Sequence, residues 1–254
     1  MIIVKNHDEL EKMRLAGRMT KEICDTVVQS VGPGVSTEEI NRYAAELIKQ
    51  HGAQSAFLGY RGYPGVICVS INEEVVHGLP GPRRIQLGDI VSLDIGVVFG
   101  GFVGDMATTI MVGVSDPEII RLVTTTQQAL AAGIRKAWAG NRLSDISAAI
   151  EQVAMQAGFS VVRDFVGHGI GRTMHEDPQI PNFGPPGRGP VLRAGMTLAI
   201  EPMINMGAAA VDVQADQWTV VTSDRRPSAH FENTIAVGKS AAEVLTCAVE
   251  KRDN

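Results

Sequence analysis

The sequence runs through the same order of elements twice. A segment with helical periodicity is followed by a second such segment and then by short β-branched runs separated by Gly and Pro. The same order of helix, helix and strands then occurs again. Ser36, with Glu39 three residues later, predicts a capping box at the start of the second helix. The expected helices cover residues 7–30, 36–51, 115–138 and 144–158.

Short motifs also recur in the same order in both halves. One echo is a Gly-rich His triplet, one is a glycine followed six residues later by a carboxylate, and one is an acidic residue shortly before Thr-Ile. The matching segments are 76–78 with 167–169, 88–94 with 195–201, and 105–110 with 232–235. Three ordered echoes favour an internal duplication over chance. The sequence therefore predicts one domain, 1–254, with half-repeats of about 1–113 and 114–250 that face each other across a pseudo-twofold axis.

Composition excludes several classes of protein. Net charge is −5 with a pI near 5.7, so no basic surface argues for a specific nucleic-acid partner. No window approaches 18 apolar residues, and the N-terminus is charged from residue 5, so neither a membrane span nor a signal peptide is expected. The three cysteines are scattered and form no CxxC pair, which is typical of a cytoplasmic protein without a disulfide framework.

Two carboxylates are expected close together on one hairpin. In the run IVSLDIGVVFGGFVGDMATTI, alternation places Asp94 on the strand face opposite Val91, Leu93, Ile95 and Val97, and Gly100-Gly101 predicts the turn. Asp105 then lies either directly opposite Asp94 or diagonal to it, at roughly 5–8 Å on the same face. Like charges so placed repel, and a cation between them removes the conflict.

The second half adds two carboxylates and two histidines. Glu201 and Glu232 stand in apolar strands, where buried acids need partners or metal, while His168 and His175 flank the turn GHGIGRTMHEDP. His230 is expected on the strand face opposite Glu232 and is not counted as a ligand. Oxygen-rich, thiolate-free ligands suit Mn, Fe(II), Co or Zn in a paired site. The expected ligands are Asp94, Asp105, His168, Glu201 and Glu232.

These residues lie in blocks that resemble the type I methionine aminopeptidases, and the resemblance covers essentially the whole chain. The blocks are YRGYPGVICVSINEEVVHGLP, LGDIVSLDIGVVFGGFVGDMATTI, FVGHGIGRTMHEDPQIPN, LRAGMTLAIEPM and SAHFENTI. The resemblance implies an α+β pita-bread fold, a curved and mainly antiparallel sheet with helices on its outer face. Type I fits better than type II because only 26 positions separate His175 from Glu201, which leaves no long insertion.

The resemblance also implies roles for individual residues. Two divalent ions bridged by Asp105 and Glu232 activate a water molecule, and Glu201 shuttles its proton to the leaving amine. His175 stabilises the developing oxyanion, and His77 hydrogen-bonds the scissile amide. A monovalent cation is implied near Asn72–Glu74 and Ser228. The implied wall of the substrate pocket comprises Phe57, Tyr60, Tyr63, Cys68, Met174 and Trp218, with His77 and His175 at the scissile bond. Some close relatives differ where Phe57 and Met174 stand, so the pocket shape is not carried over.

The activity implied is removal of the initiator methionine from the N-termini of nascent polypeptides by a cytoplasmic, monomeric enzyme. Arg83-Arg84 and residues 224–227 are the basic spots that could touch the ribosome surface. One alternative is a pita-bread binding protein without catalysis, which is disfavoured because all five ligands are present. Another is an X-Pro aminopeptidase or prolidase, whose relatives carry a large N-terminal domain for which this chain leaves no room.

Overall fold

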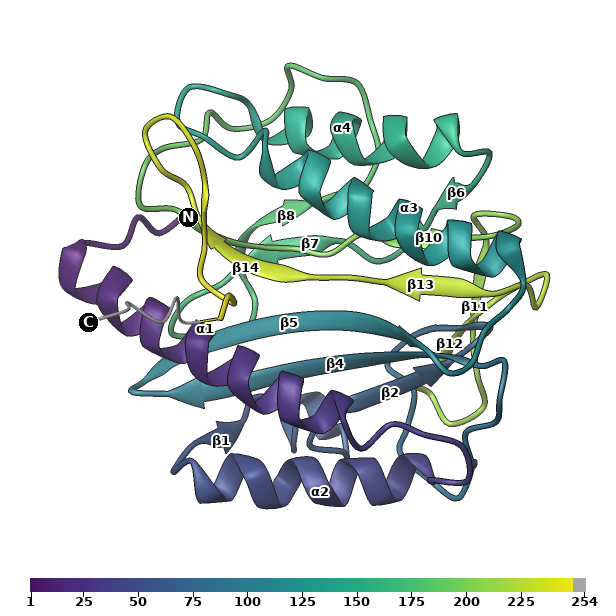
Figure 1. Ribbon diagram of the computed structural model, residues 1–254. Helices are drawn as coiled ribbons and strands as arrows, with labels where there is room; N and C mark the ends of the chain where they lie inside the picture. The colour runs from purple at the N-terminus through teal and green to yellow at the C-terminus, as the bar shows by residue number, and fades with distance from the viewer. Residues whose placement is uncertain (249–254) are drawn as a thin grey trace, which may run out of the picture.

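Two helices followed by several strands occur twice along residues 1–248, the part of the chain that the computed structural model describes (Figure 1). Each round begins with two α-helices and continues into antiparallel strands, so the element order follows the sequence-based expectation. The last two positions of the expected second half-repeat, 249 and 250, lie outside the described residues. In chain order the elements are α1 (His7–Val28), α2 (Thr37–Gln50), β1 (Gln54–Ser55), η1 (Tyr60–Gly62), β2 (Cys68–Ile71), β3 (Glu74–Val76), β4 (Ile90–Phe99), β5 (Phe102–Met111), α3 (Pro117–Ile134), α4 (Leu143–Gln156), β6 (Ser160–Val161), β7 (Gly167–Gly169), β8 (Glu176–Ile180), β9 (Thr197–Ile200), β10 (Met203–Asn205), β11 (Val211–Val213), β12 (Val220–Thr222), β13 (Ser228–His230), β14 (Asn233–Ala236) and β15 (Glu243–Val244).

Local capping chemistry sets the starts of three helices. The capping box expected at Ser36 and Glu39 is confirmed at α2, and a second one, from Asn6 and Glu9, starts α1. The side chain of Asp116 caps α3, with Pro117 in its first turn. These caps depend only on residues three or fewer apart.

Several helix ends differ from expectation, and two of the differences have a visible cause, one tertiary and one local. The third helix ends at Ile134 rather than at 138, because the chain then bonds to a distant segment just after β14: the Ala139 N–H donates to the Gly238 carbonyl at 2.9 Å. The fourth helix begins at Leu143 rather than Ser144, since Asp145 accepts a hydrogen bond from the Arg142 N–H at 2.8 Å. Neither shift moves a candidate site residue.

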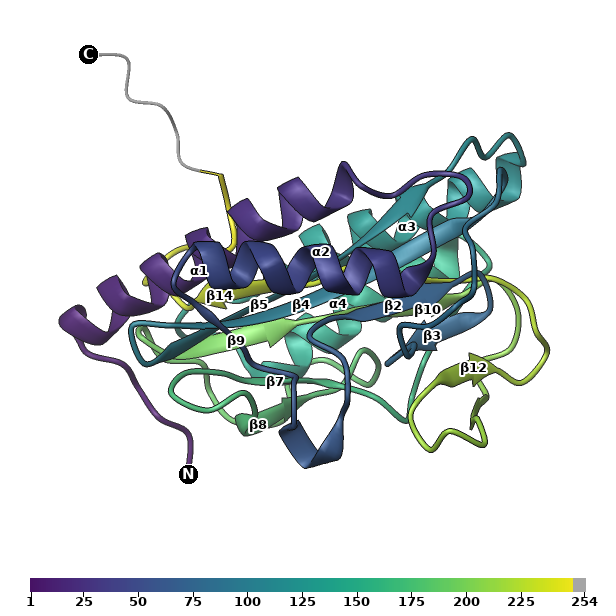
Figure 2. The ribbon, with the colours of Figure 1, turned by 90° about the horizontal axis from the view of Figure 1, so that it is seen from below.

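The strands form mainly antiparallel sheets centred on two groups. In the first half, β4 pairs with β1, β2 and the long β5. In the second half, the order is β15-β14-β9-β7-β8. Figure 2 shows α1, α2 and α3 on one side of these strands, with β7, β8 and β12 toward the other. The expected α+β architecture, with helices on one face of antiparallel sheets, is confirmed.

Apolar clusters fill the space between helices and strands in each half. Residues of α1 and α2 pack on the alternate positions of β4 predicted to face the core, and residues of α3 and α4 pack on β9 and β14. Helix α1 lies close against β5 at Gly104, where an added Cβ would stand 2.5 Å from Thr20 Oγ1 and 2.7 Å from the Ala16 carbonyl oxygen. A glycine is therefore required there for the helix to approach the sheet.

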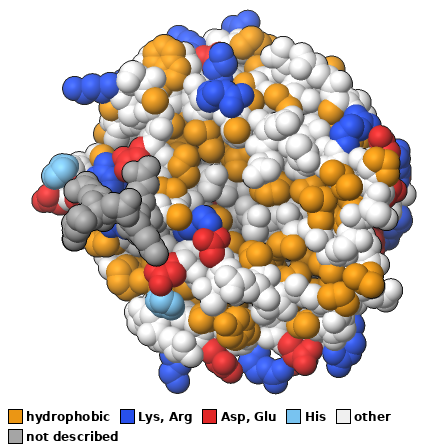
Figure 3. All heavy atoms as spheres, in the orientation of Figure 1, with side chains coloured by type: hydrophobic (Ala, Val, Ile, Leu, Met, Phe, Trp, Pro, Cys, Tyr) orange, Lys and Arg blue, Asp and Glu red, His pale blue; other side chains and the backbone are white. Residues whose placement is uncertain are grey.

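The helical face exposes no large concentration of one charge. Figure 3 shows charged side chains mainly near the margin of this face, with uncharged atoms over most of its middle. Within residues 1–248, none of the helices is both long enough and apolar enough to cross a bilayer. The concentration of titratable groups lies inside the molecule, among the strands.

Candidate metal centre and active site

The β4–β5 hairpin brings the first two carboxylates onto one face. Gly100 and Gly101 form its loop, both with positive φ (59° and 78°), and Phe99 pairs with Phe102. In this register Asp94 pairs with Ala107 and Asp105 pairs with Gly96. Of the two arrangements left open by the sequence, the diagonal one is therefore found.

A threonine joins the two halves directly at Asp105. Thr234 Oγ1 accepts a hydrogen bond from the Asp105 N–H at 3.0 Å and donates one to the Asp105 carbonyl at 2.8 Å. One step of the ladder further on, the Glu232 N–H donates to the carbonyl of Ala107 at 2.9 Å. These bonds run between β5 and the start of β14, so they set Asp105 and Glu232 side by side although 127 positions separate them.

Three buried side chains form a compact group of potential metal ligands. Asp105, His168 and Glu232 each offer one ligand atom, and these atoms all lie within 4.8 Å of one another. His168, from β7, presents Nε2 at 3.8 Å from Asp105 Oδ2 and at 3.5 Å from Glu201 Oε1. Its Nδ1 lies 2.9 Å from the carbonyl oxygen of Gly169, which leaves Nε2 free to face the carboxylates.

Asp94 completes the set expected from the sequence. It lines the same cavity as His168 and Glu201, and its Oδ1 is buried without a hydrogen-bond partner. Glu201 follows β9 directly, with only 14% of its side chain exposed. The structure therefore brings together all five residues proposed as ligands, from β4, β5, β7 and the facing ends of β9 and β14.

The protein by itself does not compensate the charges of this cluster. Burial raises the pKa of Asp94 to about 7. Burial first, and then the neighbouring carboxylates, raise the pKa of Asp105, Glu201 and Glu232 well above their usual range. Burial lowers the pKa of His168 to about 3, so its imidazole is neutral at physiological pH and able to act as a ligand.

The donor atoms of this cluster fit divalent cations. Asp94 Oδ1, Asp105 Oδ1 and Glu232 Oε1 are buried carboxylate oxygens that lack any hydrogen-bond partner. Buried, unpaired carboxylates are strongly unfavourable unless a cation or proton compensates them. A set of four carboxylates and one neutral imidazole matches the preference of Mn, Fe(II), Co or Zn for oxygen and nitrogen ligands.

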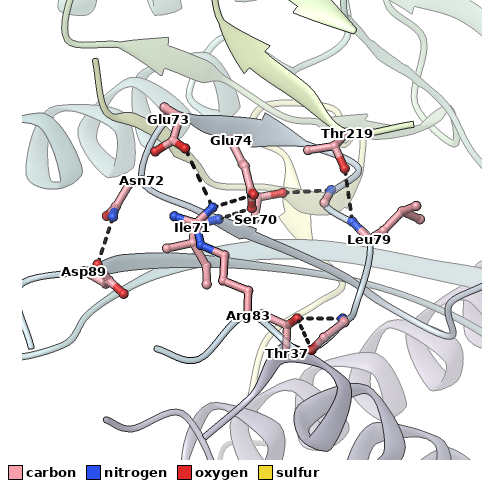
Figure 4. A network of polar contacts seen from close by, with 12 residues as sticks. Thr37, Ser70, Ile71, Asn72, Glu73, Glu74, Leu79, Arg83, Asp89 and Thr219 are labelled. Atoms are coloured by element: carbon pink, nitrogen blue, oxygen red, sulfur yellow. Dashed lines mark hydrogen bonds and ion pairs between the residues drawn. The ribbon is translucent and has the colours of Figure 1, made fainter. Parts of the chain in front are cut away.

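His77 stands on a tightly held loop between β3 and Pro80. Its φ is +59°, an uncommon value for a residue with a side chain, which the bonds on either side maintain. The Gly78 N–H donates to Ser70 Oγ at 3.1 Å, and the Leu79 N–H donates to Thr219 Oγ1 at 3.4 Å (Figure 4). Gly78 has no room for a side chain, because a Cβ would lie 2.3 Å from the Val69 carbonyl oxygen.

Polar contacts around β3 fix the base of the same loop. Glu74 accepts hydrogen bonds from the Ile71 N–H at 2.7 Å and from Arg83 Nη1 at 2.6 Å, and Asn72 Nδ2 donates to Asp89 at 2.8 Å (Figure 4). The imidazole of His77 itself packs edge-on against Phe165, with 5.5 Å between ring centroids. Its pKa is lowered to about 4, chiefly by burial, so it is neutral at pH 7.

His175 lines the cavity beside His168. Its Nδ1 is 2.8 Å from the hydroxyl of Tyr60, on which its ring stacks at 5.3 Å between centroids. Its ring centroid is 4.2 Å from that of His168. Burial, and then the positive charge of Arg61, lower the pKa of His175. Both His77 and His175 therefore present neutral imidazoles to the cavity from opposite halves of the chain.

A cavity of about 360 Å³ leads to the cluster, and every residue expected at its wall lines it. The ring of Phe57 lies over Gly96, where an added Cβ would meet Phe57 Cε1 at 2.5 Å. Tyr63 packs edge-on against Trp218, and its hydroxyl donates toward the carbonyl of Gly78 at 3.0 Å. The eight wall residues are Phe57, Tyr60, Tyr63, Cys68, His77, Met174, His175 and Trp218.

Other lining residues were not expected from the sequence. Val76, Phe165 and Val166 add apolar surface, while Arg61, Asp164 and Gln179 add polar groups. Phe165 and Val166 begin the same FVGHG block as His168, and Val76 precedes His77, so adjacency to a candidate was the available signal. Arg61 likewise follows the candidate Tyr60. Asp164 and Gln179 adjoin no candidate, because only the folded chain shows which side chains reach the cavity.

The expected placement of His230 is wrong. Its Nε2 lies 3.8 Å from Glu201 Oε2, is buried and has no hydrogen-bond partner. Residues two apart in a strand share a face, so alternation itself places His230 on the same side as Glu232, and His230 faces the cluster rather than away from it. It does not belong to the compact group of Asp105, His168 and Glu232.

An α+β fold whose inner strands gather acidic and imidazole side chains beside a cavity is the arrangement of a metal-dependent hydrolase. The model of metallopeptidase family M24 matches residues 11–239, and the chain belongs to that family.

Relatives of known sequence and structure support the assignment to this family. The chain is 50% identical to the methionine aminopeptidase of Clostridium perfringens, over 97% of this chain and 99% of the relative. The crystal structure of methionine aminopeptidase from Rickettsia prowazekii superimposes with a TM-score of 0.96 at 40% identity, covering 97% and 100% of the two chains. The pita-bread fold expected from the sequence is thereby confirmed. A prolidase from Pyrococcus horikoshii shares the fold alone, with a TM-score of 0.80 at 20% identity, over 99% of this chain and 65% of that one.

Proposed function

We propose that this protein is a metal-dependent methionyl aminopeptidase that removes the N-terminal methionine from nascent proteins and peptides. One observation carries the proposal: a cavity walled by Tyr63, Cys68, Met174 and Trp218 ends at Asp94, His168 and Glu201. An apolar pocket with a polarizable lining suits the thioether side chain of a substrate methionine, and the acidic end of the cavity suits the free amino group of the substrate. Relatives close to 50% identical over nearly their whole length carry the name methionine aminopeptidase.

Five residues are proposed to hold two divalent ions. Asp105 and Glu232, set side by side by the bonds between β5 and β14, would hold these ions from the two halves of the chain. Such ions, when bound, supply Lewis-acid chemistry that polarises the scissile carbonyl and makes water acidic enough to attack near neutral pH. The remaining proposed ligands are Asp94, His168 and Glu201.

Three side chains are proposed to move or stabilise charge during the reaction. Glu201, at the edge of the cluster and with a raised pKa, accepts the proton of the attacking water and passes it to the leaving amine. His175 donates a hydrogen bond to the oxygen on which negative charge develops. His77, neutral and rigidly placed, hydrogen-bonds the scissile amide. The requirement for a free amine at the acidic end makes the enzyme an exopeptidase.

We further propose a cytoplasmic monomer formed by one catalytic domain, contact with the ribosome surface, and a monovalent cation near Asn72–Glu74 and Ser228. The last is compatible with a hydrogen bond of 2.9 Å from the Ser228 N–H to the Asn72 carbonyl, which brings those two segments together. The identities of the divalent ions belong to the same set of proposals.

The test uses protein stripped of metal and refilled with Mn or Co. It should release methionine from Met-Ala-Ser and leave both N-acetyl-Met-Ala-Ser and an X-Pro dipeptide intact. Hydrolysis of the X-Pro dipeptide alone would assign a prolidase, and hydrolysis of nothing under any of these metals would leave a binding protein. The comparisons do not favour either alternative, since the prolidase similarity extends to fold only.

Variants then test the roles. Glu201→Gln should keep the fold and lose several orders of magnitude in kcat, because its amide cannot accept the proton. His77→Ala should lower kcat with little change in metal content. If His77→Ala removes the metal instead, the role assigned to His77 is wrong.

A further inference from the structure

A buried ion pair links the N-terminal segment to the turn that carries His175. Lys5 Nζ lies 2.5 Å from Glu176 Oε2, and only 3% and 6% of the two side chains are exposed. The backbone of Lys5 is itself anchored, since its N–H donates to the Gly195 carbonyl at 2.8 Å and Val4 bridges to Met196. The Lys5 side chain therefore starts from an anchored backbone and carries its ammonium group to Gly171 and Glu176.

The other oxygen of Glu176 holds the His175 turn, residues 171–176, from inside. Its Oε1 accepts hydrogen bonds from the N–H groups of Arg172 at 2.9 Å and Thr173 at 3.5 Å. The pair also fills the space above Gly171, where an added Cβ would stand 2.5 Å from Glu176 Oε1 and 2.7 Å from Lys5 Nζ. The Glu176 carboxylate thus links the backbone at the start of the His175 turn to the ammonium group of Lys5.

Burial of this pair is hard to explain by stability alone. Removing two charges from water costs about as much as their attraction returns, and apolar side chains of equal volume often serve as well. The pair instead fixes the position of the His175 turn, because Glu176 directly follows His175 in the chain. The imidazole of His175 is held on its other side by the Tyr60 hydroxyl at 2.8 Å.

We propose that Lys5 and Glu176 are positioning residues for His175, acting through the His175 turn without touching substrate. The inference rests on the proposed function, in which His175 stabilises the oxyanion. A group that must meet a developing charge tolerates little displacement, and a shift near 1 Å costs about 10²-fold in rate. The N-terminal segment, outside the cavity, thereby sets the catalytic geometry within it.

The experiment compares Lys5→Met, Glu176→Gln and the double variant in the metal-loaded enzyme, with Met-Ala-Ser as substrate. Each single variant should lose about 10²-fold in kcat with metal per chain unchanged. The double variant should lose about as much as either single variant, since one interaction is removed in all three. Arg14→Gln is the matched control: Arg14 binds Glu243 through two bonds of 2.6 and 2.7 Å, also from the N-terminal region but away from the turn. It should keep kcat within about twofold.

A structural readout separates this inference from the proposed function. Crystal structures of Lys5→Met and of the double variant should show the Tyr60–His175 distance lengthened beyond about 3.5 Å, where the hydrogen bond is lost. If the wild-type enzyme cleaves no peptide, the proposed function fails while this distance still tests the pair. If the wild-type enzyme is active and the variants keep both kcat and the Tyr60–His175 bond, the inference fails and the function stands.

Two further outcomes would also overturn the inference. Equal losses in Arg14→Gln would assign the effect to general loosening of the N-terminal segment, and loss of bound metal would assign it to the ligand cluster. Should a single variant not fold, the double variant decides, because it buries no uncompensated charge. A folded double variant with wild-type kcat would refute the positioning role, and one with kcat reduced about 10²-fold would support it.

Discussion

Replacing Asp94 with asparagine should stabilise the metal-free protein at alkaline pH. Asp94 is a carboxylate that the surrounding protein leaves without a hydrogen-bond partner at Oδ1 and whose pKa burial raises from 3.8 to about 7. Asparagine has nearly the same shape and carries no charge. The same substitution removes a proposed metal ligand, so its effect should change sign when metal is supplied.

The size and pH dependence follow from linkage between proton binding and folding. Below about pH 4 the Asp94 carboxyl holds its proton in both folded and unfolded chains and contributes nothing. As pH rises from there to about 7, the unfolded chain releases the proton while the folded chain retains it, so stability falls. Each pH unit is worth about 1.4 kcal/mol, and the penalty reaches about 4 kcal/mol above pH 7. The Asp94→Asn variant would escape this penalty, with a gain near zero at pH 4 and up to about 4 kcal/mol at pH 8.

Urea unfolding followed by circular dichroism measures the difference. Wild type and Asp94→Asn are compared with EDTA at pH 4 and pH 8, and again at pH 8 with Mn or Co in excess. Asp116→Asn, at the exposed cap of α3, is the control and should be close to neutral, because both residue types cap helices well. With metal present, wild type should become the more stable of the two, since only it keeps all five ligands. An Asp94→Asn variant no more stable than wild type in EDTA at pH 8 would refute the claim that this carboxylate is uncompensated.

Two further substitutions test the contacts that position Asp105 and His77. Thr234→Val keeps the shape of the side chain but leaves the buried N–H of Asp105 without a partner, so it should lower the free energy of unfolding in urea by about 1–3 kcal/mol. Thr124→Val is the control and should cost little, because the exposed Thr124 hydroxyl bonds only within helix α3. Gly78→Ala forces a Cβ to 2.3 Å from a carbonyl oxygen and should lower kcat/KM for Met-Ala-Ser by at least about tenfold through displacement of His77, with metal content unchanged. Gly81→Ala, with its nearest neighbour at 4.0 Å, is the control, and equal losses in both would contradict the reasoning.

Features of the fold that rest on neighbouring residues were predictable. The capping box of Ser36 and Glu39, the cap at Asp116 and the alternation of β4 each involve residues a few positions apart. The Gly100-Gly101 turn was predictable as well, although its registers could not be separated. The choice needed the positive φ of both glycines, which pairs Phe99 with Phe102 and leaves Asp94 diagonal to Asp105.

Features that rest on meetings between distant segments were not predictable. The third helix ends early because the chain after it pairs with Gly238. Lys5 and Glu176, 171 positions apart, gave no sign in the sequence of forming a buried pair. In each case the deciding contact lies beyond the range over which helical or strand periodicity carries information.

The order of residues along the chain specified which acids and imidazoles stand in apolar strands, and it led us to predict two half-repeats. Only folding brought these groups together. Thr234 bonds to both backbone groups of Asp105, and Gly104 lets α1 approach β5, so the spacing between ligands from different halves is set by packing. Alternation specifies the face on which a side chain lies, but distances of a few ångströms between remote strands depend on how every intervening side chain fills the space.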